Sequence, residues 1–354
     1  MKKKSVCLFY LDYSTFVRED DKILSSEFDL TKYRFITSKK ISFFFYQFIK
    51  QFWFLSINIR KFDVIYCWFS DYHSLLPMLF GKIFRKKNII IVGGYDAVAV
   101  PQINFGVFLK NNLRNYCARI SYKFADIIVP VDQTLVEGIN YYADPTGNGL
   151  PTGVKSFVKR IKGRFVVIMT GYDEKKWRNY TGREKEKSVV TIGGAPNIQT
   201  FRRKGLDFLI DIAKIMPDIK FTIIGLKGKM MEYAKRQAGE NVNLIGFIPN
   251  DKLPEFISKY KVFAQFSLSE GLPNTLCEAM LCECVPVGSS ANGIPYGIGD
   301  CGFVLNEKNT EKAAELIRKA LDSDYELGVK ARQRIIDNFL IEKRKQKIID
   351  LIIN

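Results

Sequence analysis

The sequence contains a single histidine, His73, among 354 residues. One histidine cannot build a multi-histidine metal site, and it leaves little material for a serine–histidine catalytic pair. There are seven cysteines, but Cys282 and Cys284 are separated by only one residue and do not give the C-x2-C spacing of a zinc site. We therefore expect reduced thiols and no metal site.

Acidic residues are too few to balance the basic ones. The chain has 37 Asp and Glu against 54 Lys and Arg, which leaves a net charge of +17. Such an excess predicts an anionic partner, which is a nucleic acid, a phosphorylated small molecule or an anionic lipid surface. The basic residues are dispersed, and no helix-turn-helix, RNP or zinc signature is present, so a nucleic acid is not the expected partner.

A convincing membrane-spanning segment is also missing. The segment 41–59 is mostly apolar, and nineteen helical residues reach about 28 Å. Lys50 lies in its middle, however, and a charge there costs about 2.5–3.5 kcal/mol in a bilayer core. Two interpretations remain: a crossover helix that packs on a sheet, or a helix whose aromatic face lies in the lipid interface. Basic residues that would meet anionic lipid flank the segment: Lys39, Lys40, Arg60 and Lys61.

Short apolar runs, separated by stretches long enough for crossover helices, recur through most of the chain. A polar, charged stretch at 178–187 interrupts them. This pattern predicts an α/β fold with two Rossmann-like domains facing across a cleft. We place the domains at 1–175 and 176–335, and expect a helix at 336–354 that packs back on the first domain. The expected strands are 5–11, 63–68, 88–93, 126–131, 165–169, 188–192, 220–225, 242–245, 261–267 and 285–288.

The most informative motif follows the expected strand 261–267. Glu270 stands at the carboxyl end of that strand, which is where open α/β sheets bind their ligands. The helix that follows would offer unpaired N–H groups to a phosphate. A purely structural alternative exists for the second carboxylate, because Thr275 and Glu278 have the spacing of a helix-capping box. That alternative leaves Glu270 unexplained.

This stretch resembles retaining glycosyltransferases of family 4. Glu270 and Glu278 reproduce their E-x7-E signature within an E-G-L-P-N-x-L-x-E-A-M sequence. Further similarity lies in the R-K-G helix start at 203–205, in the strands around 189–193 and 284–288, and in the turn at 301–305. The resemblance covers the C-terminal half and implies a GT-B fold, with an acceptor-binding first domain and a second domain that binds the nucleotide-sugar.

The resemblance also implies roles for individual residues. Glu278 matches the carboxylate that holds the ribose hydroxyls, and Glu270 the one near the transferred sugar. Lys204 matches the lysine that pairs with the diphosphate. The resemblance implies that the backbone of the motif faces the sugar and the diphosphate, through Gly271, Leu272, Pro273, Asn274 and Thr275. It also implies that Gly193, at the end of the strand around 189–193, binds the donor.

Two positions depart from the family pattern or match it loosely. An arginine commonly follows the strand glycine in the family, whereas this chain has Gly194 there. Arg202 or Arg203 is expected to substitute for it, and we take Arg203 as the candidate. In the first domain, Asp96 follows a glycine pair where the family often places a polar residue beside the reacting sugar. We take Asp96 as a catalytic candidate, although an aspartate in a turn explains it equally well.

These observations predict a retaining, metal-independent glycosyltransferase that uses a nucleotide-diphosphate-sugar as co-substrate and needs no cofactor. A saccharide or lipid-linked acceptor, with peripheral contact to an anionic membrane at its cytoplasmic face, would fit assembly of a bacterial surface polysaccharide. Two other functions stay open: a nucleotide-sugar epimerase of the same architecture, and a non-catalytic basic protein bound to a membrane.

Overall fold

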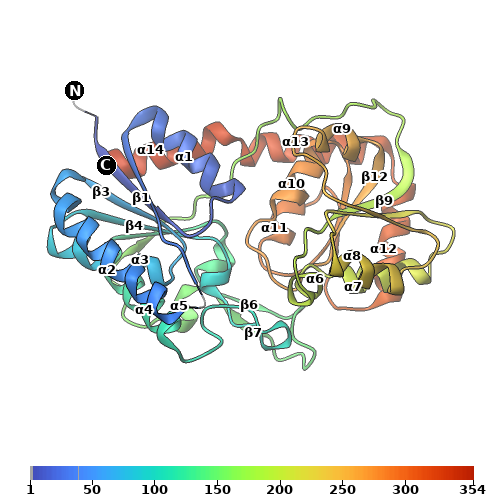
Figure 1. Ribbon diagram of the computed structural model, residues 1–354. Coiled ribbons are helices and arrows are strands. Elements are labelled where there is room, and N and C mark those ends of the chain that lie inside the picture. Colours follow the sequence, from blue (N-terminus) through green and yellow to red (C-terminus); the bar gives the residue numbers. More distant parts are fainter. Residues whose placement is uncertain (1–2, 39) are drawn as a thin grey trace.

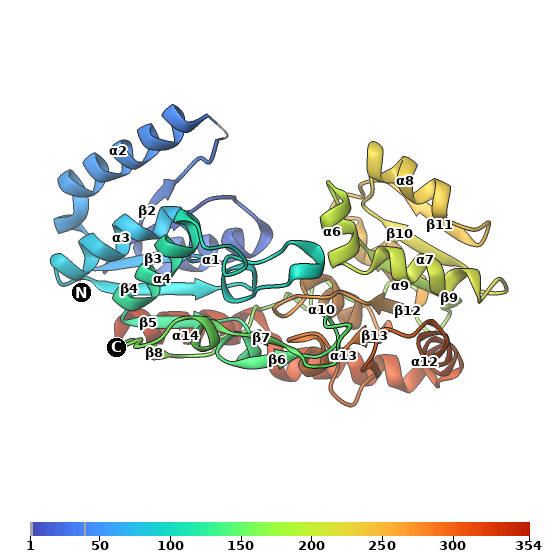
Figure 2. The ribbon, with the colours of Figure 1, turned by 90° about the horizontal axis from the view of Figure 1, so that it is seen from below.

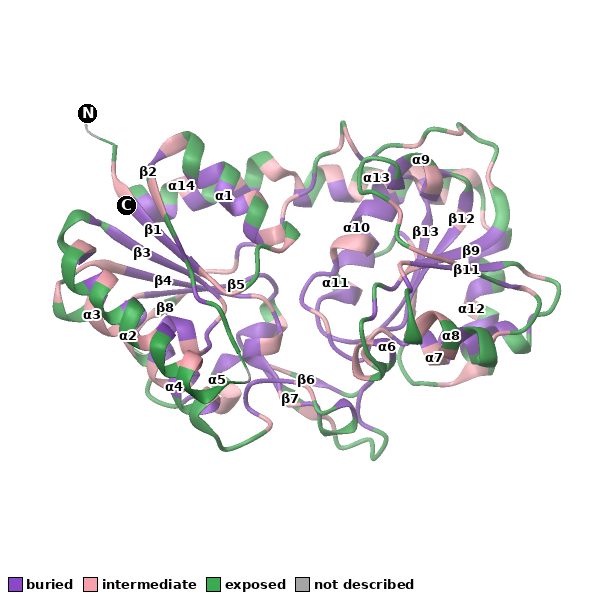
Figure 3. Ribbon diagram, viewed as in Figure 1, coloured by how far each residue is buried: buried purple, intermediate pink, exposed green. Residues whose placement is uncertain are grey.

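The computed structural model describes residues 3–38 and 40–354, so Met1, Lys2 and the flanking Lys39 lie outside the described residues. Two domains stand side by side, each built on a six-stranded parallel sheet with helices on its faces (Figure 1). The inner strands of both sheets are among the most buried parts of the chain (Figure 3). The expected α/β architecture of two Rossmann-like domains is confirmed.

The first sheet has the order β2-β1-β3-β4-β5-β8. Its inner strands are continuous apolar runs because helices cover both faces of a parallel sheet. The strands are β1 (Ser5–Tyr10), β2 (Asp29–Arg34), β3 (Val64–Trp68), β4 (Lys87–Val92), β5 (Ile127–Pro130) and β8 (Arg164–Phe165). The helices between them are α1 (Thr15–Glu27), α2 (Ile41–Asn58), α3 (Tyr72–Ile83), α4 (Leu113–Phe124) and the short α5 (Val154–Phe157).

The second sheet has the order β11-β10-β9-β12-β13-β14. Its strands are β9 (Glu186–Ile192), β10 (Phe221–Ile224), β11 (Val242–Ile245), β12 (Tyr260–Gln265), β13 (Val285–Ser289) and β14 (Phe303–Leu305). The helices are α6 (Ile198–Arg203), α7 (Leu206–Lys214), α8 (Lys229–Gln237), α9 (Leu253–Ser258), α10 (Asn274–Leu281), α11 (Ile294–Ile298) and α12 (Thr310–Asp322). Most observed strands coincide with the expected runs to within about two residues.

Some strands differ from the sequence-based expectation. The run 165–169 gives only the two-residue β8, because pairing with β5 ends at Phe165. The edge strands β2 and β14 were not expected from the sequence. A small hairpin of β6 (Gly138–Asn140) and β7 (Leu150–Thr152) leaves the first domain and reaches the second, where Asn140 Nδ2 donates to the Leu268 carbonyl at 2.8 Å.

Two helices at the end of the chain cross between the domains. Helix α13 (Tyr325–Phe339) packs on α10, and α14 (Ile341–Ile353) continues onto the first domain, beside α1 (Figure 1). Arg344 of α14 is buried there and forms an ion pair with the buried Asp20 of α1, with both contacts at 2.8 Å.

The apolar segment 41–59 forms the helix α2 with a short 3-10 turn after it, and α2 lies at the periphery of the first domain next to α3 (Figure 2). Within the described residues, no helix combines the length and apolar character needed to cross a bilayer.

Candidate active site

A cavity of about 250 Å³ lies between the domains, where the carboxyl ends of their strands meet. The first domain contributes Phe16, Trp68 and Gly93, among others, and the second contributes the loop that joins β12 to α10. This loop and the C-terminal end of helix α6 carry most of the donor-binding residues expected from the sequence. The residues from the second domain that line the cavity are Arg203, Lys204, Glu270, Gly271, Leu272, Pro273, Asn274 and Thr275.

The loop after β12 approaches the first domain closely at Gly271. A Cβ atom at this position would lie 2.9 Å from the Gly93 carbonyl oxygen and 2.8 Å from a Val131 methyl group. Only glycine fits that approach without displacing a backbone. Helix α10 begins at Asn274, so its first N–H groups are directed toward the loop and the cavity, where an anion would be favoured.

Glu270 is held by a short chain of side chains. Its Oε1 lies 2.9 Å from Nη1 of Arg203, and it accepts a hydrogen bond from Ser267 Oγ at 3.2 Å. Ser267 Oγ in turn accepts from Gln265 Nε2 at 2.6 Å, and Gln265 Oε1 accepts from Thr275 Oγ1 at 3.1 Å. The carboxylate is therefore fixed before any substrate arrives, which lowers the entropic cost of orienting one.

Lys204 lies next to this ion pair. It ends α6, and the left-handed backbone of the following Gly205, with φ of 69°, turns the chain into α7. A Cβ atom on Gly205 would lie 2.1 Å from the Phe266 carbonyl oxygen, so the turn requires glycine. Burial lowers the pKa of the Lys204 ammonium, and the negative charge of Glu270 opposes that change. An incoming diphosphate would favour the charged form further.

Glu278 lines an adjoining cavity of about 320 Å³, together with Glu19 and Lys176. Burial raises the pKa of Glu278 to about 7. The positive charge of Lys176 opposes this rise, and the negative charge of Glu19 adds to it. The capping-box interpretation is wrong, because α10 starts at Asn274 and the Thr275 hydroxyl bonds to Gln265 instead. The buried carboxyl of Glu278 is therefore free of that structural role. The two cavities share Phe16, Thr170 and Asn274 and form one continuous cleft.

Asp96 does not reach this cleft, so its proposed contact with substrate needs correction. The side chain is fully buried and accepts hydrogen bonds from the backbone N–H groups of Ser70, Gly93 and Gly94 at 3.0–3.1 Å. The Tyr122 hydroxyl donates to it at 2.9 Å. Burial raises the pKa of Asp96 to about 6. The geometry makes Asp96 a positioning residue that shapes the glycine turn below the cavity.

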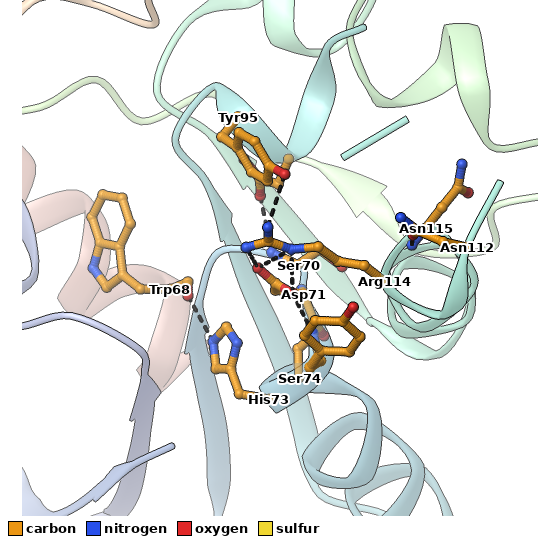
Figure 4. A network of polar contacts seen from close by, with 11 residues as sticks. Trp68, Ser70, Asp71, His73, Ser74, Tyr95, Asn112, Arg114 and Asn115 are labelled. Atoms are coloured by element: carbon orange, nitrogen blue, oxygen red, sulfur yellow. Dashed lines mark hydrogen bonds and ion pairs between the residues drawn. The ribbon is translucent and has the colours of Figure 1, made fainter. Parts of the chain in front are cut away.

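A polar network supports the same turn from its outer side (Figure 4). Arg114 Nε donates to both carboxylate oxygens of Asp71 at 2.8 Å, and Nη1 donates to the Tyr95 hydroxyl at 2.9 Å. Asp71 also caps α3 through a capping box with Ser74. His73 lies in this helix start; it is buried, and its Nε2 is 2.9 Å from the Trp68 carbonyl oxygen. Burial lowers the pKa of His73 to about 4.

Besides Asp96, Gly193 and Arg202 lie outside the cavity walls, and some residues that line the cavity were not expected from the sequence. Gly193 directly follows β9, and its N–H donates to the Ile224 carbonyl at 2.8 Å. Arg202 is exposed, while Arg203 lines the cavity. Trp68, which also lines the cavity, was not singled out, although its position at the end of an expected strand is the signal that could have found it.

Solved structures with the same arrangement of domains exist. The crystal structure of Anabaena Alr3699/HepE in complex with UDP superimposes with a TM-score of 0.71 and 15% identity, covering 99% of both chains. Residues 173–339 match the model of the family described as glycosyl transferases group 1. The chain has the GT-B fold, and its second domain belongs to that family.

Two of the sequence relatives extend over most of this chain. It is 26% identical to a trehalose synthase from Pyrococcus horikoshii over 319 residues, which are 84% of this chain and 70% of the relative. It is 22% identical to a Campylobacter jejuni N-acetylgalactosamine-N,N'-diacetylbacillosaminyl-diphospho-undecaprenol 4-alpha-N-acetylgalactosaminyltransferase over 294 residues, which are 77% and 72% of the two chains. Within the glycosyltransferase, the family match covers the whole second domain and its cleft residues.

Proposed function

We propose that this glycosyltransferase moves a sugar from a nucleotide-diphosphate-sugar to a hydroxyl of a saccharide or lipid-linked acceptor, with retention of configuration, as in family 4. One observation carries the proposal: Arg203, Lys204 and the start of α10 converge with Glu270 on one cavity between the domains. Two cations and a helix N-terminus form an environment that suits a diphosphate.

The proposed chemistry uses the charge that develops on the leaving group. The bond between the anomeric carbon and the phosphate oxygen breaks with its electron pair on the diphosphate, and Lys204 and Arg203 stabilise that charge. The acceptor oxygen then bonds to the same face of the sugar, and its proton passes to the departing phosphate oxygen. No protein nucleophile and no cofactor take part in this proposal. Glu270 positions the sugar.

The nucleoside would occupy the adjoining part of the cleft. Glu278 offers a buried carboxyl that can accept hydrogen bonds from the two ribose hydroxyls, and Lys176 lines the same cavity. Cavity walls from the first domain, including Trp68 and Phe16, would contact the acceptor or the sugar. We assign the acceptor to the class of lipid-linked saccharides because the Campylobacter jejuni relative is named for a diphospho-undecaprenol substrate. That assignment places the reaction at the cytoplasmic face of a bacterial membrane, in surface polysaccharide assembly.

The test is incubation of the full chain with a panel of UDP- and GDP-sugars and a lipid-linked saccharide, with diphosphate release and the anomeric configuration of the product as readouts. Acceptor-dependent release and a retained configuration are expected. Conversion of the donor without any acceptor would support the epimerase alternative instead. Thermal shifts by UDP or GDP identify the base beforehand, because a bound ligand raises the apparent stability of the folded state.

A further inference from the structure

Helix α2 presents large apolar residues to solvent, in addition to the apolar side chains that it packs on the first domain, such as Leu55 and Phe48. The residues that face inward include Gln47 and Gln51, which are buried, and Gln51 Nε2 donates to the His73 carbonyl at 2.9 Å. The opposite side, which we call the outer face of α2, is made of large apolar side chains that are each 45–73% exposed. The outer face consists of Ile41, Phe45, Tyr46, Ile49, Phe52, Trp53 and Ile57.

A helix that only covers a protein core has a polar outer face, whereas α2 is apolar on its outer face as well. Ile41, Phe45, Ile49, Trp53 and Ile57 are spaced four residues apart and form one row along the helix, about 25 Å long. A continuous exposed apolar row of this kind marks an interaction site, because single exposed apolar residues are scattered on ordinary surfaces. The outer face as a whole also contains a tryptophan and a tyrosine, Trp53 and Tyr46, which are the side chains enriched at membrane–water interfaces.

Basic residues surround the outer face, and acidic residues are missing from its neighbourhood in the sequence. The segments 30–62 and 72–95, which contain α2 and α3, have no Asp or Glu. At the C-terminal end of α2, Arg60 lies over the Phe84 ring at 5.9 Å and its carbonyl accepts from Lys86 Nζ at 3.2 Å. Exposed Lys50 extends from α2 itself. The apolar row is thus flanked by positive charge.

We propose that the outer face of α2 lies in the headgroup region of a membrane that contains anionic lipids. An anionic bilayer satisfies both features, because the apolar side chains enter the acyl boundary while the cations contact lipid phosphates. A second copy of this basic chain would bring the same positive residues together, which repulsion disfavours. The inference goes beyond the proposed transfer reaction, since none of the residues of the outer face lines the cleft described above.

The position of α2 also relates this membrane contact to the cleft. The helix follows β2 and begins on the side of the first sheet that faces the cleft (Figure 2). On its inner side Phe44 packs against Tyr72, with ring centroids 4.8 Å apart, and the Arg114 guanidinium lies 5.7 Å from the Tyr72 ring. Arg114 then contacts Tyr95 in the glycine turn. A bilayer on α2 would therefore lie on the first-domain side of the cleft, where acceptors are proposed to bind.

The first experiment is co-sedimentation of the full chain with vesicles of phosphatidylcholine alone and of phosphatidylcholine with phosphatidylglycerol. Binding to the anionic vesicles is expected, with weaker binding to the neutral ones. The variant F45S/I49S/W53S should reduce vesicle partitioning at least about tenfold. Because these side chains are exposed, the variant should fold normally. The control Phe247→Ser removes a 79% exposed aromatic residue from the second domain and should bind like the wild type.

The contribution of positive charge to vesicle binding is tested by one variant and a matched control variant. Replacement of Lys50, Lys61 and Lys86 by glutamine should weaken binding to anionic vesicles only. The control replaces three exposed cations of α8 by glutamine and should leave binding unchanged: Lys229, Lys235 and Arg236.

Tryptophan fluorescence reports the insertion directly. Trp53 is 61% exposed, whereas Trp68 and Trp177 are buried at 1% and 4%. Anionic vesicles should shift the emission to shorter wavelength, and Trp53→Phe should remove the shift while most of the binding remains.

The proposal would be overturned if the wild type did not bind anionic vesicles, or if the triple serine variant bound them equally well. It would also be overturned if the wild type formed a dimer that the triple variant does not form, without binding to vesicles. Transfer to a soluble saccharide acceptor is expected to be unaffected by the triple variant. Failure of the membrane proposal is therefore distinguishable from failure of the proposed reaction.

Discussion

Arg203 and Glu270 form a partly buried ion pair, with Nη1 2.9 Å from Oε1 and both side chains less than one-fifth exposed. The same guanidinium nitrogen donates to the Ser269 carbonyl at 3.0 Å and the Arg203 guanidinium lies 5.0 Å from the Phe105 ring of the first domain. The pair thus holds the expected sugar-positioning carboxylate to a helix end and to the opposite domain. Loss of either partner leaves the other charge without compensation.

Glu270→Gln should lower kcat at least about a hundredfold, because a misplaced positioning group costs that much even without a large structural change. Diphosphate release with saturating donor measures the effect. The exposed Arg318–Asp218 pair in the same domain, also at 2.9 Å, supplies the control. Asp218→Asn should keep the activity of the wild type. Turnover of Glu270→Gln close to that of the wild type would refute the role assigned to Glu270.

Lys204→Met should weaken donor binding about ten- to a hundredfold, since a hydrogen bond between charged groups contributes about 1.5–3 kcal/mol. Methionine keeps the apolar stem of the lysine but removes its ammonium group, whose pKa is lowered because burial disfavours the charge. The thermal stability of the free protein should therefore not fall. Titration calorimetry with UDP or GDP gives the affinity, and Lys214→Met on the exposed end of α7 is the control. Equal affinity in both variants contradicts the assignment.

The raised pKa of Glu278 predicts a pH dependence with a definite sign. Below about pH 4.5 the carboxyl is neutral in both folded and unfolded chains, so it contributes no difference. As the pH rises, the Glu278 carboxyl loses its proton in the unfolded chain before it does so in the folded protein. The free energy of unfolding therefore falls, by up to about 3 kcal/mol once the pH has passed about 7. Glu278→Gln should thus raise Tm relative to the wild type at pH 8 but not at pH 4.5.

Donor binding by Glu278 should change in the opposite direction. A carboxylate accepts hydrogen bonds from ribose hydroxyls better than a neutral carboxyl does, so donor affinity of the wild type should increase between pH 6 and about 8. Glu278→Gln should lose this increase, whereas the exposed Glu232→Gln should keep it. A wild-type Tm that rises with pH relative to Glu278→Gln would contradict the burial argument.

Asp96→Asn separates a positioning role from direct contact with substrate. The asparagine amide places N–H donors against backbone N–H groups, so we expect a loss of about 1–3 kcal/mol in unfolding free energy. Tyr122→Phe, which removes only the hydroxyl bonded to Asp96, should give a smaller loss in the same direction. Chemical denaturation measures both. Unchanged stability with abolished turnover would instead restore Asp96 as a substrate contact.

The sequence allowed the fold class to be predicted because buried parallel strands are continuous apolar runs. Edge strands lack that property: β2 has only Tyr33 buried and alternates with polar residues such as Lys32 and Arg34, so no apolar run indicates it. The run after Phe165 is apolar but leaves the sheet, and only tertiary contacts determine where pairing stops.

The candidate site was predictable to the extent that motifs fix it. The loop after β12 and the end of α6 were found because residue types and spacing are local properties. Asp96 was misplaced because a turn sequence does not reveal whether its carboxylate points to solvent or to the backbone below. Gln265 and Ser267, which hold Glu270, lie within the expected strand 261–267, where apolar neighbours hide their polar contacts.

Because α14 packs on the first domain, the first structural domain consists of the amino-terminal half of the chain together with its last helix. Asp20 accepts hydrogen bonds from Tyr66 and Trp68 as well as from Arg344, and Lys4 Nζ donates to the Ile352 carbonyl at 2.9 Å. A fragment that stops at the junction between the halves would leave a buried anion uncompensated beneath the cleft floor. Dissection of this enzyme therefore requires supplying the last fifteen or so residues in trans, or joining them to the amino-terminal half by circular permutation.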